Sequence, residues 1–170
     1  RKLHGSVTPM PEEIFDVVDD QDEVIDRLPR DEVHRRKLNH RAIHLLVYNA
    51  AGQVFLQQRS MQKDTHPGKW DSSVSGHLDS GESYDACVIR ETQEEIGLRL
   101  DTTPEKLFKL DSCKETDQEF VWVYRSQAEG PFELHPQEIL AGEWFDPEIL
   151  SSRVTQSPED FAPAFVYIWK

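Results

Sequence analysis

The sequence predicts one α/β domain with a mixed β-sheet over residues 13–170, preceded by a flexible N-terminal tail over residues 1–12. A length of 170 residues suits a single domain with a sizeable core. Apolar stretches of strand length lie before and after one well-formed amphipathic helix, which is an order typical of α/β folds. No internal repeat or low-complexity linker divides the chain, so we expect one folded unit.

The first half of this domain is predicted to consist mainly of strands. Phe15–Val18 and Val24–Ile25 flank an acidic turn, and a short helical turn is expected after Pro29. The strongest strand is Ala42–Tyr48, with the sequence AIHLLVY. A turn of small and polar residues separates it from Val54–Leu56, so these two strands are expected to form a hairpin.

One helix dominates the second half. Residues 83–96 carry an apolar stripe, Ser83 is a suitable N-cap, and Gly97 stands where a helix-terminating glycine belongs. The remaining predicted elements are strands at Leu107–Leu110, Phe120–Tyr124 and Trp144–Phe145, and a C-terminal helix over Pro158–Trp169 that is interrupted or started near Pro163.

Composition excludes several classes of partner. The net charge of −13 argues against a nucleic-acid binder and against attachment to anionic membranes. No apolar run is long enough to span a bilayer, and the first residues lack the apolar core of a secretion signal. The two cysteines, Cys87 and Cys113, have no metal-binding or disulfide spacing, so we expect reduced thiols and a cytoplasmic protein. An anionic substrate would need cations supplied locally.

Three carboxylates share one face of the predicted helix. Glu91, Glu94 and Glu95 stand at positions i, i+3 and i+4. Their repulsion costs a few tenths of a kcal/mol per pair, roughly, in an isolated helix. Mg²⁺ prefers oxygen ligands and bridges to substrate phosphates, so a divalent cation would offset this cost. Taken alone, the same pattern favours a solvated acidic surface.

The surrounding residues resemble the Nudix box. That motif has a glycine, five residues, a glutamate, seven residues, Arg-Glu, two residues, Glu-Glu, one residue and a glycine. Its fixed positions are matched here by Gly76, Glu82, Arg90, Glu91, Glu94, Glu95 and Gly97. The one departure is Thr92, where an aliphatic residue is usual.

This resemblance implies an α/β/α sandwich and a divalent metal, Mg²⁺ with Mn²⁺ as the alternative. It implies that the three helix glutamates bind the metal, that Gly76 offers its backbone carbonyl, and that Glu82 and Arg90 form a salt bridge between loop and helix. Family members cleave a nucleoside diphosphate linked to another group, by water attack on phosphorus. We therefore expect a small-molecule diphosphate substrate, and a monomer or homodimer.

The catalytic candidates are Glu91, Glu94 and Glu138. Glu138 lies in the segment HPQEILAGEWF, which many Nudix enzymes use to place a late carboxylate near the metal. The family varies in which glutamate acts as the general base, so Glu94 and Glu138 stay as rivals for that role.

A second resemblance covers roughly Phe15 to Leu150. The segments NHRAIHLLVYNAAGQ, QQRS, PGKWDSSVSGH and DQEFVWVY are similar to the isopentenyl-diphosphate isomerase branch of the same superfamily. That isomerase uses a cysteine just before a Gly-His pair, and here this position is Ser75. A serine hydroxyl is far less acidic than a thiol. The intact box and Ser75 favour a hydrolase built on an isomerase-like body, with isomerisation or non-catalytic diphosphate binding as alternatives.

The isomerase branch also implies a second metal site and a diphosphate grip. Its metal ligands would match His40, His77, Asp117 and Glu119. A further histidine is expected before His40, but the spacing to His34 is off by one. For His34 and His44 we therefore favour an ordinary surface or hydrogen-bonded role, and for His77 ligand and bystander roles are equally open.

The substrate-binding candidates are Arg59, Lys63 and His77, of which Arg59 and Lys63 match the residues that grip the diphosphate. We favour this role for Arg59 and leave it open for Lys63. The group beyond the diphosphate is not specified by the sequence. Four aromatic residues could stack a base or belong to the core with equal weight: Tyr48, Phe55, Trp70 and Trp122.

Overall fold

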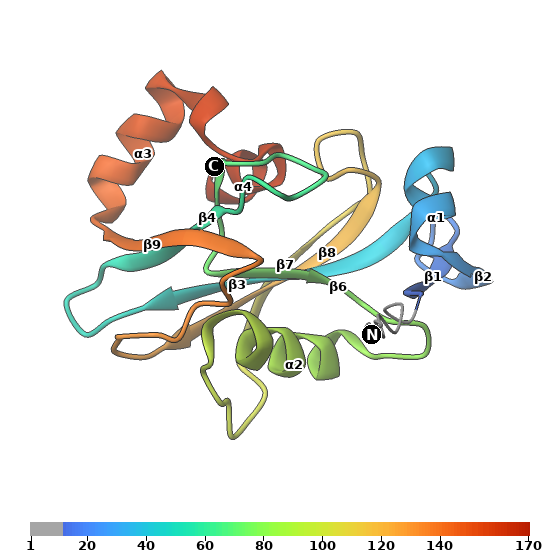
Figure 1. Ribbon diagram of the computed structural model, residues 1–170, viewed down its shortest axis with the longest axis horizontal. Helices are drawn as coiled ribbons and strands as arrows, with labels where there is room; N and C mark the ends of the chain where they lie inside the picture. The colour runs from blue at the N-terminus through green and yellow to red at the C-terminus, as the bar shows by residue number, and fades with distance from the viewer. Residues whose placement is uncertain (1–11) are drawn as a thin grey trace, which may run out of the picture.

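The computed structural model describes residues 12–170 (Figure 1). The predicted tail thus lies outside the described residues, apart from its last position. In chain order the elements are β1 (Ile14–Val18), β2 (Val24–Pro29), α1 (Arg30–Arg36), β3 (His40–Tyr48), β4 (Val54–Arg59), β5 (Trp70–Asp71), β6 (Val74–His77), α2 (Tyr84–Ile96), β7 (Glu105–Leu110), β8 (Glu119–Gln127), β9 (Ile139–Phe145), α3 (Pro147–Gln156), a 3₁₀ turn (Pro158–Asp160) and α4 (Pro163–Trp169).

A mixed sheet forms the middle layer. Its main path is β5-β4-β3-β8-β7, with β6 also pairing with β3 and β9 with β4. β3 and β8 run parallel, whereas the other pairs are antiparallel. β3 is buried along nearly its whole length because it has the longest pairings and both of its faces are covered. The predicted mixed sheet is confirmed.

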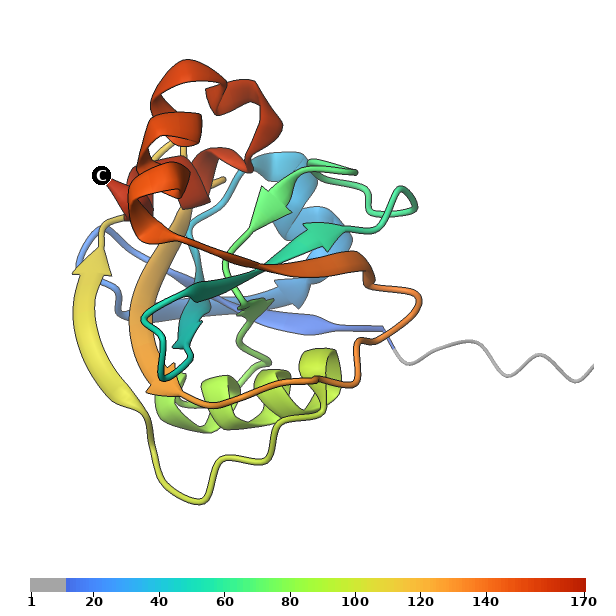
Figure 2. The same ribbon diagram turned by 90° about the vertical axis from the view of Figure 1, so that its left-hand side faces the viewer.

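Helices cover both faces of this sheet (Figures 1 and 2). α2 packs on one face through Cys87, Val88 and Ile96. α3 and α4 pack on the other face, through side chains that include Leu150 and Phe165. This arrangement is the three-layer α/β/α sandwich that the family resemblance implied. No helix among residues 12–170 has the length and apolarity that a bilayer crossing requires.

Most predicted elements are present, often longer than expected. α2 begins after Ser83, whose side chain accepts a hydrogen bond from the Ala86 amide, and it ends at Gly97 in a left-handed conformation. The predicted strand at 144–145 is the end of the longer β9. The C-terminal prediction is confirmed in its divided form, because α4 starts at Pro163.

Sequence reasoning missed α3 and the short strands β5 and β6. α3 carries a recognisable start signal: Asp146 caps it by accepting bonds from the Glu148 and Ile149 amides, and Pro147 occupies its first turn. Its apolar face is short, with only Leu150 and Val154 buried. The strands β5 and β6 have only two and four residues, which are too few to show a periodic pattern in the sequence.

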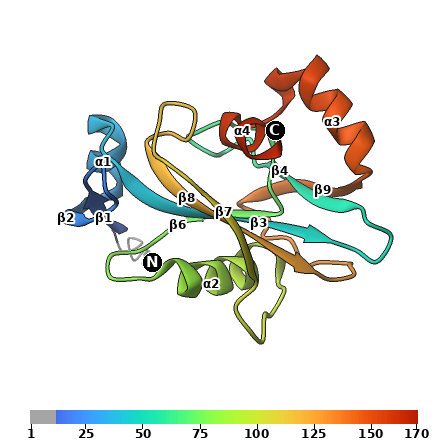
Figure 3. The ribbon, with the colours of Figure 1, turned by 180° about the vertical axis from the view of Figure 1, so that it is seen from behind.

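The β1–β2 hairpin lies with α1 at one end of the sheet, as the view from behind shows (Figure 3). A buried aspartate in its turn fastens it there. Asp22 accepts hydrogen bonds from Arg41 Nε at 2.7 Å, Tyr84 Oη at 2.8 Å and Lys109 Nζ at 2.7 Å. These donors come from β3, α2 and β7, so one carboxylate joins the hairpin to three other elements. Asp16 of β1 likewise holds the loop before α2, through Ser80 and Gly81.

Candidate functional site

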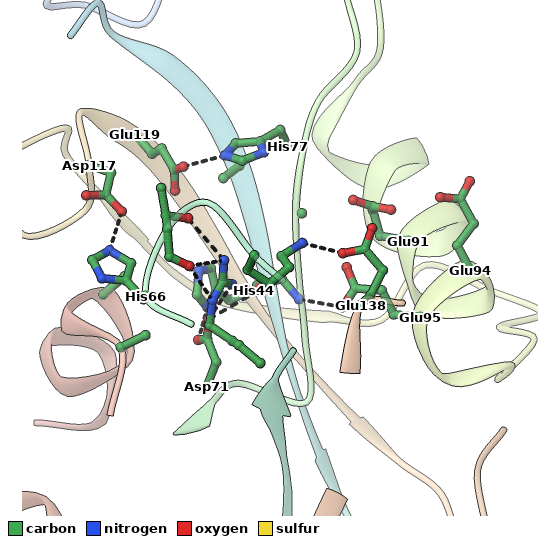
Figure 4. Close-up of a pocket in the computed structure, with 18 of the residues that line it drawn as sticks. His44, His66, Asp71, His77, Glu91, Glu94, Glu95, Asp117, Glu119 and Glu138 are labelled. Atoms are coloured by element: carbon green, nitrogen blue, oxygen red, sulfur yellow. Dashed lines mark hydrogen bonds and ion pairs between the residues drawn. The ribbon is translucent and has the colours of Figure 1, made fainter. Parts of the chain in front are cut away.

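One cavity of about 610 Å³ collects the predicted site residues. Its walls come from β4, β6, α2 and the loops 60–69 and 128–138. In Figure 4 the glutamates of α2 lie toward one end of this cavity, with His66 and Asp117 toward the other. The predicted residues that line it are Arg59, Lys63, Gly76, His77, Arg90, Glu91, Glu94, Glu95 and Glu138. Glu82 and Gly97, which were predicted to be structural, lie outside its lining.

The three α2 glutamates differ in environment. Glu95 is buried and accepts hydrogen bonds from Gln57 Nε2 at 2.8 Å and from the Ser75 amide at 3.3 Å. The Glu91 side chain is mostly buried, whereas that of Glu94 is 53% exposed. Burial raises the pKa of Glu91 and of Glu95 above the usual carboxyl value, and the charge of Glu95 adds to this effect at Glu91. Two buried carboxylates thus face the cavity, and among the described residues the one cation in contact with them is Arg90, 3.3 Å from Glu91.

The backbone at Gly76 lies directly against Glu91. A β-carbon added at Gly76 would overlap the Glu91 carboxylate. β6 holds this position by pairing with β3, with Gly76 opposite Ile43. The requirement for glycine here comes from this close approach of backbone and carboxylate.

These residues fit a hard divalent cation. The donors are oxygens, two of the carboxylates have raised pKa values because of burial, and the glycine leaves space at Glu91. Such a set suits Mg²⁺, with Mn²⁺ as the alternative. A bound cation would supply the positive charge that the buried carboxylates lack and that the phosphates of a substrate require.

Arg90 joins the loop before α2 to the helix. It makes a two-pronged ion pair with Glu82, with both N–O distances at 2.8 Å. A third nitrogen, Nη1, lies 3.3 Å from Glu91 and 3.2 Å from Glu94. The loop-to-helix salt bridge implied by the family resemblance is therefore present, and it also reaches two of the candidate metal ligands.

The end of α2 positions the loop 128–138. Gly97 has a φ of 68°, and a β-carbon there would come within 2.9 Å of the Glu133 Cβ. The His135 amide donates to the Glu95 carbonyl at 2.8 Å. These contacts bring His135 and Glu138 to the cavity wall.

A polar network around Arg59 lies at the base of the 60–69 loop. The Arg59 guanidinium donates to the Thr65 carbonyl at 2.8 Å and to the buried Asp71 at 3.3 Å. Ser75, which stands where the isomerase resemblance places a cysteine, donates to the same Asp71 at 3.4 Å. His44 is buried, with Nδ1 3.7 Å from Asp71. Most hydrogen bonds of the Arg59 guanidinium thus hold the 60–69 loop, although the side chain also lines the cavity.

His34 belongs to a histidine cluster, contrary to the ordinary role that its spacing favoured. The ligand atoms of His34, His40 and His77 all lie within 4.8 Å of one another. Lys37 ends α1 in a left-handed conformation, and the chain then continues into β3. Glu119 joins the cluster, 2.6 Å from His77 Nε2 and 3.4 Å from His40 Nε2.

The cluster has the chemistry of a metal site. Burial lowers the pKa of His34, and lowers that of His77 to about 4, so both imidazoles are neutral near pH 7. His40 Nδ1 lies 2.9 Å from the Leu38 carbonyl, which leaves the lone pair on Nε2. Among the described residues, this buried Nε2 makes no hydrogen bond. Three imidazoles and one carboxylate fit a nitrogen-preferring divalent cation.

Asp117 is separate from this cluster. Its carboxylate lies 2.9 Å from His66 Nε2, so the two side chains bridge the 60–69 loop and the turn before β8 (Figure 4). The histidine cluster therefore contains His34 in place of Asp117, compared with the set that the isomerase branch implied.

The four aromatic residues that could have stacked a base lie elsewhere. Phe55 packs edge-on against Phe132 and Trp144. Trp70 packs against Phe145, and cations lie over the rings of Tyr48 and Trp122. Within the described residues, none of the four lines the cavity. Of the two alternatives, packing against the core is therefore favoured over stacking a base.

Comparisons with known proteins identify the family of this chain. The model of the NUDIX domain matches residues 38–165. An uncharacterised Nudix hydrolase of Yersinia pestis is 33% identical over 153 residues, covering 87% of this chain and 81% of that protein. An isopentenyl-diphosphate Delta-isomerase of Clavibacter michiganensis subsp. michiganensis is 30% identical over 161 residues, covering 91% and 83%.

A solved structure shows the same fold at nearly full length. The crystal structure of a Deinococcus radiodurans protein superposes with a TM-score of 0.83 at 28% identity, covering 92% of this chain and 97% of that one. The similarity thus extends to both hydrolases and isomerases, as the sequence motifs indicated. Because the domain model matches well over half of the sequence, this chain belongs to the Nudix family.

Proposed function

We propose that this protein is a Mg²⁺-dependent hydrolase, with Mn²⁺ as an alternative metal, that cleaves a diphosphate linkage by water attack on phosphorus. The predicted substrate class is a nucleoside diphosphate derivative. The observation that carries the proposal is the convergence of Glu91, Glu95 and Gly76 in one cavity, where buried carboxylates with raised pKa values face the backbone at a glycine.

In this proposal Glu91, Glu94 and Glu95, with the Gly76 carbonyl, hold the metal. The attacking water loses its proton to a carboxylate, a bond forms between its oxygen and phosphorus, and the bridging P–O bond breaks to release the second phosphate. Glu94 and Glu138 are the candidates for this base, because both line the cavity and both are partly exposed.

Cationic and imidazole groups in the same cavity support phosphate binding. The candidates are Lys63, His77 and Arg59. Lys63 has the most mobile charge of the three, because Arg59 is hydrogen-bonded to Thr65 and Asp71. We infer that Lys63 makes the principal contact with the diphosphate and that Arg59 keeps its loop in place.

A panel assay in ¹⁸O-labelled water tests the proposal. Nucleoside di- and triphosphates, dinucleoside polyphosphates, sugar nucleotides, thiamine diphosphate and prenyl diphosphates would be incubated with Mg²⁺, and products followed by mass spectrometry. We expect phosphate or nucleotide release with the label on one phosphate product. Binding of these compounds without turnover of any of them would instead support a non-catalytic diphosphate-binding module.

Isomerisation of isopentenyl diphosphate is the second candidate, favoured by the histidine cluster of His34, His40 and His77 with Glu119. We propose that this cluster holds a second, nitrogen-preferring cation. Ser75, however, stands in place of the cysteine whose acidic thiol isomerisation uses. Incubation with isopentenyl diphosphate should give no allylic isomer. Metal analysis of the purified protein should find a transition metal or Zn²⁺, and His40→Ala should lower its content.

A further inference from the structure

Lys63 places an ammonium group among the carboxylates of the proposed metal site. Its Nζ forms an ion pair with Glu138, which lies 75 residues later in the chain. The backbone fixes this pairing, because the Ser60 amide donates to the Glu138 carbonyl at 3.0 Å and so ties the 60–69 loop to the start of β9. Figure 4 shows Glu138 beside Glu91 and Glu95.

The same ammonium acts on Glu95. Burial raises the pKa of Glu95, its hydrogen-bond donors Gln57 and Ser75 are neutral, and the charge of Lys63 opposes the rise. Burial also acts on Glu138, yet the hydrogen bond from Lys63 holds its pKa below the usual value. One lysine thus partly neutralises two carboxylates that face the cavity.

The neighbouring arginines are held in place by several partners each. Arg90 makes its shortest pair with Glu82 while also contacting Glu91 and Glu94. Arg59 is bound to Asp71 and the Thr65 carbonyl. A flexible lysine chain, unlike these held guanidinium groups, can move its charge over several ångströms at little cost.

We propose that Lys63 is an internal counter-ion of the carboxylate cluster, which a divalent cation displaces and which then pairs with a substrate phosphate. The inference rests on the hydrolase function proposed above and adds a consequence to it. The cation and the ammonium repel each other within the carboxylate cluster, so Lys63 weakens metal binding to the free protein. An anionic ligand gives the displaced ammonium a new partner, so metal and anion each bind better when the other is present.

Calorimetric titration of Mg²⁺ into the substrate-free protein tests whether Lys63 weakens metal binding. Mg²⁺ is the suitable probe because it selects oxygen ligands over the histidine cluster. Lys63→Met removes the charge and keeps the chain length, and we expect it to tighten Mg²⁺ binding by about three- to tenfold. Lys63→Arg keeps a positive charge and should stay close to wild type.

A matched control lies in the same loop. Lys69 donates to the Glu159 carbonyl and does not line the cavity within the described residues, so Lys69→Met removes one positive charge outside the cluster. Its Mg²⁺ affinity should stay within about twofold of wild type, because exposed charges act weakly over distance. Equal affinities in Lys63→Met and Lys69→Met would overturn the inference, as would weaker binding in Lys63→Met.

The pairing itself is tested in a Glu138→Gln background. If the pair with Glu138 holds Lys63 in the cluster, then adding Lys63→Met to Glu138→Gln should tighten Mg²⁺ binding by no more than about twofold, because the two substitutions remove one interaction. Tightening as large as in the wild-type background would overturn the assignment of Glu138 as the carboxylate that holds Lys63.

Inorganic phosphate tests whether an anion strengthens metal binding through Lys63. Saturating phosphate should tighten Mg²⁺ binding to the wild-type protein, and this gain should disappear in Lys63→Met. A gain of equal size in both proteins would overturn the coupling role of Lys63.

Turnover by the wild-type protein with unchanged Mg²⁺ affinity in Lys63→Met would overturn this inference alone. Tightening in Lys63→Met without turnover of any diphosphate supports this inference and overturns only the hydrolase proposal.

Discussion

Asp22 and Glu95 are buried to the same extent, with 8% of each residue exposed, yet their surroundings are opposite. Asp22 receives hydrogen bonds from two cations and a tyrosine, which lower its pKa against the effect of burial. Glu95 receives bonds only from neutral groups, and burial raises its pKa. The scaffold neutralises its buried charge with hydrogen-bonded cations, whereas in the cavity Lys63 offsets the charge only in part and leaves the rest to a bound cation. Perturbed carboxylates of the second kind are typical of functional sites.

Glu95→Gln should have the largest effect on this comparison. We expect activity to fall by about a thousandfold or more, because the proposed metal site loses a charged ligand. Glu94→Gln should likewise remove most activity. Thermal unfolding of the metal-free protein should be unchanged or shifted upward in Glu95→Gln, since an uncompensated buried charge is removed.

Glu148→Gln is the control for these variants, because Glu148 is exposed on α3. Its activity and melting temperature should match those of wild type. Full activity in both Glu94→Gln and Glu95→Gln would contradict the proposed metal site.

Asp22→Asn should give the opposite pattern. Removing the charge leaves Arg41 and Lys109 without their shared partner, so we expect a loss of about 3 kcal/mol in the free energy of unfolding, measured with urea. Asp20→Asn, in the same turn but exposed, should change it by less than about 0.5 kcal/mol. If Asp22→Asn were as stable as the control, the hairpin would not depend on this carboxylate.

The two regions should also respond oppositely to pH. The lowered pKa of Asp22 adds stability above its unfolded value near 3.8, and that stability is lost as the pH falls through the folded pKa. The raised pKa values of Glu91 and Glu95 act the other way: their contribution is complete below about 4.5 and is lost as the pH rises through neutrality.

Urea unfolding of metal-free protein across this pH range measures both effects. Asp22→Asn should flatten the acid side of the profile and Glu95→Gln the neutral side. Mg²⁺ should restore stability most at the higher pH, where the carboxylates are ionised. If stability near neutral pH were the same in Glu95→Gln as in the wild-type protein, the raised pKa of Glu95 would be contradicted.

Gly97→Ala should have the smallest effect. Gly97 has a positive φ and little space beside Glu133, so we expect a loss of about 1–2 kcal/mol in stability. Activity per folded molecule should fall less than in Gly76→Ala, because only the second change displaces Glu91. Comparing specific activity with melting temperature for both variants separates the two glycines. Equal activities would show that the space at Gly76 is not required.

The sequence predicted the carboxylate helix well because its signals are local. Ser83, Gly97 and the spacing of the three glutamates each follow from helix geometry alone. The hairpin of β3 and β4 was equally local, although only two residue pairs join these strands before β6 replaces β4 as the partner of β3. α3 was missed because its apolar face has two buried residues, and its cap was not recognised.

Contacts between distant segments lay beyond the sequence. The spacing of His34 from His40 favoured an ordinary role for His34, yet the fold brings these two rings and His77 together. Arg59 matched a phosphate-binding position, yet the fold engages its guanidinium with Thr65 and Asp71. Neither outcome follows from residue types, because each depends on how one loop packs against another.

The sequence by itself determined the family and the candidate residues for its chemistry: the box from Gly76 to Gly97, the three glutamates on one helix face, and the serine at position 75. Helical periodicity and motif spacing act over a few residues, so they can be read directly from the chain. Only the tertiary structure decided which charges are neutralised. Lys63 meets Glu138 across 75 residues, and Asp22 meets Lys109 across 87. Burial and pairing, which set the pKa of a carboxylate, are properties of the folded chain.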